Sequence, residues 1–119
     1  MNRLIKNFLT TTLLCLWAST GFTHTDVMQT TPENGAVIDT KPEVIVINFA
    51  SEIRLARVQL VDEQGDARKL SLKGQKTFLT KFEFPFDGEG LGKFTVNWRG
   101  IGADGHVLNG SFDFTIAAK

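Results

Sequence analysis

His24 and His106 are the two histidines among the 119 residues, and each lies where it could bind a metal ion. If processing makes His24 the first residue of the mature chain, its α-amine and imidazole Nδ1 together close a chelate ring. His106 follows Asp104 with only Gly105 between them, and residues two apart in extended backbone point to the same side. These residues could supply three nitrogens and one carboxylate oxygen. A tetragonal set of this kind suits Cu(II).

Spacing alone leaves simpler interpretations open. A histidine on a protein surface is usually solvated, and an Asp-Gly pair such as Asp104–Gly105 usually marks a turn. The sequence does not place the first mature strand beside residues 103–106. A metal site formed by His24, Asp104 and His106 therefore depends on the fold.

Residues 1–23 have the features of a secretory signal peptide. Arg3 and Lys6 form a positively charged start, residues 8–18 form a short apolar stretch, and small residues follow. The apolar stretch is shorter than the roughly 20 residues that a membrane-spanning helix needs. We therefore expect export, cleavage of this segment and a soluble mature domain of residues 24–119.

Two cleavage sites fit this segment, and they predict different metal chemistry. Cleavage after Thr23 makes His24 the N-terminal residue. Cleavage after Gly21 instead leaves Phe22–Thr23–His24 at the N-terminus. A histidine in the third position can hold Cu(II) or Ni(II) with the amine, two deprotonated backbone amides and its imidazole. Such a site would need neither acidic nor imidazole ligands from residues 103–106.

The composition excludes several classes of function. Lys+Arg and Asp+Glu both count 13, so no excess of positive charge indicates nucleic acid as a partner. Cys15 is the one cysteine and is expected to leave with the signal, which excludes an internal disulfide framework and an all-thiolate metal site. Two histidines are too few for a three-histidine catalytic zinc site.

Alternation of apolar and polar residues predicts strands throughout the mature chain. A break at Ala50–Ser51–Glu52 and a turn at residues 62–66 separate the first of them. Phenylalanines at alternate positions, including Phe78, Phe82 and Phe84, are predicted to face the core. We predict an all-β fold of about seven strands, a small Greek-key sandwich or barrel of cupredoxin-like or immunoglobulin-like form. The strand segments are Val44–Phe49, Arg57–Val61, Ala67–Leu72, Phe78–Phe84, Phe94–Arg99 and Ser111–Ile116.

Three blocks of the sequence resemble the CopC/YobA family of periplasmic copper-resistance proteins. The most specific runs from Gly92–Arg99 through Ala103–His106 to Gly110–Ile116. His24 stands eight residues before Pro32–Ala36, as the first mature histidine of that family does. Val46–Phe49 followed by Ser51–Glu52 is similar to a further landmark of the family.

The resemblance implies one Cu(II) site per chain, formed by the amine and imidazole of His24 with Asp104 and His106. Many family members also bind Cu(I) through a Met-rich loop. This chain has two methionines, Met1 and Met28, and the first leaves with the signal, so we expect no such site. Phe94 also stands where the family usually has tyrosine, and Gly102 where it usually has serine. The absence of the serine hydroxyl at position 102 predicts that the loop lacks one supporting hydrogen bond.

The favoured function is a monomeric periplasmic protein that sequesters or carries Cu(II), without turnover, and that exchanges it with an inner-membrane copper transport protein. Two alternatives stay open. An N-terminal histidine paired with a second histidine also resembles the copper brace of oxidative polysaccharide-cleaving enzymes. An immunoglobulin-like interaction module without a physiological metal would leave His24 and His106 incidental.

Overall fold

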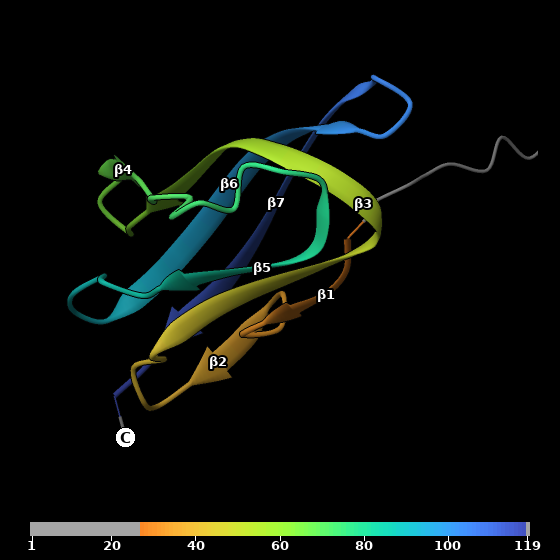
Figure 1. Ribbon diagram of the computed structural model, residues 1–119. Coiled ribbons are helices and arrows are strands. Elements are labelled where there is room, and N and C mark those ends of the chain that lie inside the picture. Colours follow the sequence, from red (N-terminus) through yellow and green to blue (C-terminus); the bar gives the residue numbers. More distant parts are fainter. Residues whose placement is uncertain (1–26, 119) are drawn as a thin grey trace, which may run out of the picture.

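The computed structural model of the protein describes residues 27–118 and forms a curled, all-β domain (Figure 1). The fold class and the strand number expected from the sequence are confirmed. Within the described residues there is no helix long and apolar enough to cross a membrane. The strands are β1 (Val27–Thr31), β2 (Ala36–Ile38), β3 (Val44–Val61), β4 (Ala67–Lys69), β5 (Leu79–Pro85), β6 (Gly92–Gly102) and β7 (Val107–Ile116).

The long strand β3 organises the whole sheet. Its first part lies between β1 and β5, and its second part lies between β4 and β6. The sheet order is β1-β3-β6-β7-β2, with β4 and β5 also paired to β3. Figure 1 shows β3 bending across the molecule, so that it belongs to both walls of the curled sheet.

The predicted break at Ala50–Ser51–Glu52 is wrong, because β3 continues through these residues. All three are exposed, and the register of β3 against β5 shifts between Asn48 and Ile53. The polar stretch therefore marks the bend at which β3 changes partners, rather than the end of a strand.

The core is built on aromatic rings, as the sequence predicts. Phe49 makes edge contacts with Phe82 at 5.7 Å and with Trp98 at 5.0 Å between ring centroids. A second group joins Phe86, Phe94 and Phe114. Phe94 is almost fully buried at 1% exposure, in an apolar setting where a phenol hydroxyl would need a partner.

Phe78 departs from the predicted core. It precedes β5, is 38% exposed, and its ring lies 5.6 Å from the guanidinium carbon of Arg54. The alternation that links Phe78 to Phe82 and Phe84 is therefore broken before β5 begins.

The turn between β1 and β2 is fastened to β7. The Asn34 side-chain oxygen accepts a hydrogen bond from the Asp113 amide at 3.0 Å, and the Gly35 amide donates to the Asp113 carbonyl at 2.7 Å. β2 then runs parallel to β7, whereas every other strand pair is antiparallel. These contacts fix where β1 lies relative to β7.

Candidate metal centre

The turn between β6 and β7 carries two of the three predicted metal ligands. Residues 103–106 connect the two strands, and the tip projects from one end of the molecule (Figure 1). The Gly102 amide donates to the His106 carbonyl at 2.9 Å, and the Gly105 amide donates to the Gly102 carbonyl at 2.9 Å. Gly105 has φ of 88°, a left-handed conformation that glycine adopts without steric cost. The Asp-Gly pair therefore forms the turn.

Within this turn the side chains of Asp104 and His106 are in contact. His106 Nδ1 lies 2.8 Å from Asp104 Oδ2, and Asp104 Oδ1 accepts a hydrogen bond from the His106 amide at 3.0 Å. The spacing predicts that the two side chains lie on one side of an extended strand. The structure instead has a turn here. Their contact is a product of that turn and of its carboxylate-to-amide bond.

The contact shifts the pKa of both groups. The side-chain hydrogen bond from His106 lowers the pKa of the Asp104 carboxyl, and the same bond raises the pKa of the His106 imidazole. The imidazole is 80% exposed and the carboxyl 68% exposed, so both can be reached from solvent. With Nδ1 facing the carboxylate, the other ring nitrogen, Nε2, carries the free lone pair of the neutral imidazole.

A shallow cleft opens beside this pair. It has a volume of about 280 Å³ and is lined by Asp104, Ala103, Gly102, Leu108 and Ser51. Ser51 belongs to the bend of β3, so the cleft joins this bend to the β6–β7 turn.

His24, the third predicted ligand, lies outside the described residues. Among residues 27–118, no group of three or more histidine, cysteine or acidic side chains is placed to hold a metal ion. The described fold therefore brings together one imidazole and one carboxylate. Further ligands for a metal at this position must come from elsewhere.

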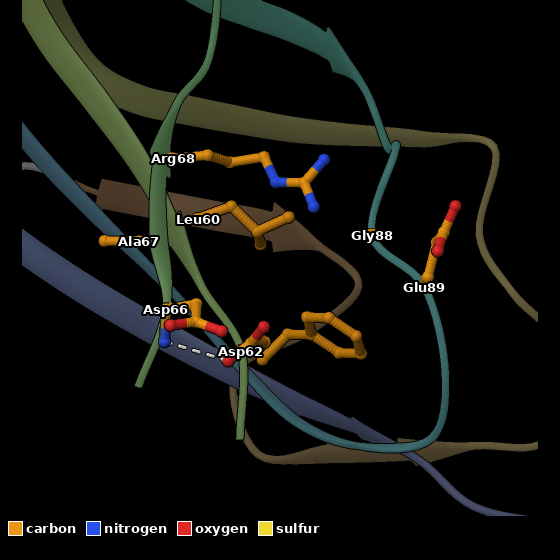
Figure 2. Close-up of a pocket in the computed structure, with 8 residues that line it drawn as sticks. Leu60, Asp62, Asp66, Ala67, Arg68, Gly88 and Glu89 are labelled. Atoms are coloured by element: carbon orange, nitrogen blue, oxygen red, sulfur yellow. Dashed lines mark hydrogen bonds between the residues drawn. The ribbon is translucent and has the colours of Figure 1, made fainter. Parts of the chain in front are cut away.

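A second cavity, of about 320 Å³, lies at the other end of β6. Figure 2 shows Asp62, Asp66 and Glu89 on its walls, together with the Arg68 side chain. One oxygen of Asp62 accepts hydrogen bonds from the backbone amides of Gln64 and Asp66. That oxygen stabilises the predicted 62–66 turn, so these acidic residues do not amount to a metal site.

Comparisons with known proteins identify the fold. The crystal structure of CopC from Methylosinus trichosporium OB3b has a TM-score of 0.66 at 17% identity, over 80% of this chain and 95% of that one. PcoC from Escherichia coli, a methionine-rich copper resistance protein, has a TM-score of 0.59 at 19% identity, over 80% and 100% of the two chains. No curated protein matches the sequence.

The family assignment comes from the sequence itself. The family model described as the CopC domain matches residues 27–117, which covers β1 through β7 and the turn that holds Asp104 and His106. The chain therefore belongs to the CopC domain family.

Proposed function

We propose that this protein binds one Cu(II) ion in the periplasm and sequesters or carries it, as a copper-resistance protein. The proposed ligands are the N-terminal amine and imidazole of His24 together with Asp104 and His106. The observation that carries the proposal is the exposed Asp104–His106 pair, which stands beside the cleft that Ser51 lines.

The position of β1 supports a contribution from His24. Val27 pairs with Phe49, two residues before Ser51, so β1 enters the sheet close to one wall of the cleft. His24 precedes Val27 by three residues, which span at most about 11 Å when extended. This entry of β1 beside the cleft supports the proposal that His24 contributes to a site with the Asp104–His106 pair.

The donor types favour Cu(II) over softer ions. Amine, imidazole and carboxylate ligands suit Cu(II), whereas Cu(I) prefers thiolate and thioether ligands. Removal of the signal would take away Met1 and Cys15. Met28 alone cannot form a multi-thioether site. Reduction to Cu(I) would therefore favour release, which suits a protein that passes copper to an inner-membrane transport protein.

Binding, rather than turnover, is the proposed activity. A carboxylate from Asp104 in the copper plane would occupy a position that oxygen chemistry needs open. Copper-dependent consumption of peroxide in the presence of a reductant, above the level given by free copper, would favour the oxidative enzyme instead.

Native mass spectrometry of the protein purified from the periplasm tests the proposal. Offered one equivalent each of Cu(II) and Zn(II), a chain that starts at His24 is expected to retain a single copper. Asp104→Ala and His106→Ala should each weaken Cu(II) binding by at least about tenfold, because each removes one ligand. Lys76→Ala, in the exposed segment between β4 and β5, is the control.

Two results would contradict this site. A chain that starts at Phe22 and binds Cu(II) equally well in both alanine variants would place copper on the N-terminal tripeptide. Failure to retain copper from either start would leave an immunoglobulin-like module whose histidines are incidental.

A further inference from the structure

Three arginines lie on the outer face of the sheet. Arg57 of β3 is paired directly with Arg99 of β6, and Arg54 pairs with Ile101 one row nearer to the β6–β7 turn. All three arginines are exposed. None of them has a carboxylate within salt-bridge distance among residues 27–118. The described fold therefore leaves these three positive charges without an acidic partner.

A β-bulge is the reason that the three arginines share one face. The pairing of β3 with β6 shifts register between Leu55 and Arg57, so Ala56 is the extra residue. In a regular strand Arg54 and Arg57, three positions apart, would point to opposite faces. The bulge redirects one of them, as bulges commonly do next to functional sites.

The arrangement does not serve folding. Arg57 and Arg99 lie directly opposite each other, and like charges in such a cross-strand position destabilise a sheet. Cα atoms of directly opposed residues in antiparallel strands are about 4.5–5.5 Å apart. Two guanidinium groups at this spacing can bind two neighbouring carboxylates. Each guanidinium can form a bidentate pair of hydrogen bonds with its carboxylate, which a lysine cannot do.

Amide and apolar side chains surround the arginines. Asn109 of β7 is paired with Arg99, and the next row pairs Gln59 with Asn97. Towards the turn, Ile101 is paired with Val107, which is 52% exposed. The Phe78 ring, 5.6 Å from the Arg54 guanidinium carbon, extends this apolar end. Arginine and aromatic residues beside amides are characteristic of protein–protein interfaces.

We propose that this outer face, formed by Arg54, Arg57, Arg99, Asn109 and Val107, is a docking surface for an acidic protein partner. The face adjoins the 103–106 turn, so a docked protein lies beside Asp104 and His106. The inference rests on the proposed function only in that copper is what the partner would exchange at this site. Docking itself needs no metal.

The chemistry of the face favours a protein over the other occupants. A protein partner can pair its carboxylates with the arginines and its backbone N–H donors with the carbonyl oxygens of Gln59, Asn97 and Asn109. A second copy that presented the carboxylates of its 62–66 turn, which lies at the opposite end of β6, would dock head to tail. Such a head-to-tail contact leads to open chains of molecules rather than a closed dimer.

The test uses copper-free protein, as cells export and process it, titrated with poly-L-glutamate in an amide NMR experiment. We expect chemical-shift changes on the outer face of β3, β6 and β7, and an affinity that falls as salt is added. Arg57→Glu/Arg99→Glu should weaken binding by about tenfold or more, from the loss and reversal of two charge contacts. Lys73→Glu/Lys76→Glu carries the same change in net charge on another exposed segment, and should weaken binding less than about twofold. Arg57→Gln/Arg99→Gln replaces the reversed pair if that variant fails to fold.

Three results would overturn the proposal. If the arginine and lysine variants weaken binding equally, binding depends on the net charge of the protein and not on this face. Arginine-dependent binding to phosphatidylglycerol vesicles, with none to poly-L-glutamate, would assign the face to a membrane surface. Arginine-dependent self-association in sedimentation would assign it to a second copy. Because the sample contains no copper, none of these results bears on the copper site.

Discussion

The contact between Asp104 and His106 couples the protonation of two exposed side chains. The lowered pKa of Asp104 and the raised pKa of His106 mean that both groups are charged between these two values. The carboxylate's contribution to stability is lost as pH falls through its lowered pKa, and that of the imidazolium is lost as pH rises through its raised pKa. The ion pair is therefore complete only between the lowered pKa of Asp104 and the raised pKa of His106.

Asp104→Asn is expected to lower the pKa of His106 towards the value of about 6.5 that an unperturbed histidine has. An asparagine keeps the size of the side chain but removes the negative charge that stabilises the imidazolium. An NMR titration of the imidazole ring protons measures this directly, with His24→Ala used to assign the two histidine signals. An unchanged midpoint would mean that the hydrogen bond does not exist in solution.

The same coupling would make Cu(II) binding at the proposed site depend on pH. Cu(II) binds the deprotonated imidazole, so the raised pKa of His106 lets protons compete with the metal. We expect affinity to fall by at least about tenfold per pH unit below this pKa, since at least one proton is displaced. A competition assay with a chromogenic Cu(II) chelator between neutral pH and about pH 5 measures the effect. Constant affinity across this range would exclude histidine and amine ligands.

Gly102→Ser is expected to tighten Cu(II) binding. A Cβ atom at Gly102 would lie 3.1 Å from Asp104 Oδ1, so a serine hydroxyl there can donate a hydrogen bond to the carboxylate. Supporting bonds of this kind orient metal ligands, and we expect a gain of about three- to tenfold. Gly102→Ala adds the same Cβ without the hydroxyl and separates crowding from hydrogen bonding. Identical affinities for the two variants would show that the hydroxyl has no effect.

At the scale of elements, the sequence predicts strands well wherever alternation is uninterrupted. It fails in β3 because the alternation is interrupted at one place and changes phase at another within the same strand. Ile45, Ile47 and Phe49 are buried at odd positions, whereas Val58 and Leu60 are buried at even ones. The bend at residues 50–52 interrupts the alternation without changing its phase, because Ile53 and Leu55 are again buried at odd positions. The bulge at Ala56 then changes the phase. Both features depend on which partner strand is adjacent.

In the candidate site, too, the sequence predicts some features and misses others. Residue types and spacing predicted that Asp104 and His106 lie together, but on an extended strand. Their contact comes instead from the turn and its carboxylate-to-amide hydrogen bond. The cleft beside the pair was not predictable, because Ser51 reaches it only through the bend of β3. The arginine face also escaped prediction, since the predicted strand began only at Arg57, which left Arg54 and the bulge between them outside it.

Gly110 gives a prediction at this scale. It lies inside β7, whereas a glycine at such a position ordinarily indicates a turn. The Trp98 ring packs against it, so the position has no room for a side chain. A Cβ atom at Gly110 would overlap with the Trp98 ring. We expect Gly110→Ala to lower the free energy of unfolding by about 1–3 kcal/mol, as overpacking in a core does.

Denaturant unfolding followed by Trp98 fluorescence measures this change. Ser111→Ala, at the exposed position next to Gly110, is the matched control and should stay within about 0.5 kcal/mol of the parent. If both variants unfold at the same denaturant concentration, the ring can move aside and the β6–β7 contact is looser than the structure indicates.

At the scale of the whole molecule, the proposed copper site joins parts of the chain that are distant in sequence. His24 precedes β1, whereas Asp104 and His106 lie between β6 and β7, and β3 and β6 separate β1 from β7 in the sheet. Only the folded chain can bring these ligands together. A ligand that binds the folded state alone stabilises it in proportion to the logarithm of its concentration.

Cu(II) is therefore expected to raise the melting temperature of the processed protein. At a free concentration 100 times the dissociation constant the gain is about 2.7 kcal/mol, or on the order of 10 °C for a domain of this size. EDTA should reverse the shift, and His106→Ala should greatly reduce it. An N-terminal Phe22–Thr23–His24 site uses consecutive residues that remain together in the unfolded chain, so it would bind both states and leave the melting temperature unchanged. Calorimetry with and without Cu(II) thus separates the two sites, and copper retained without any thermal shift would assign the metal to the tripeptide.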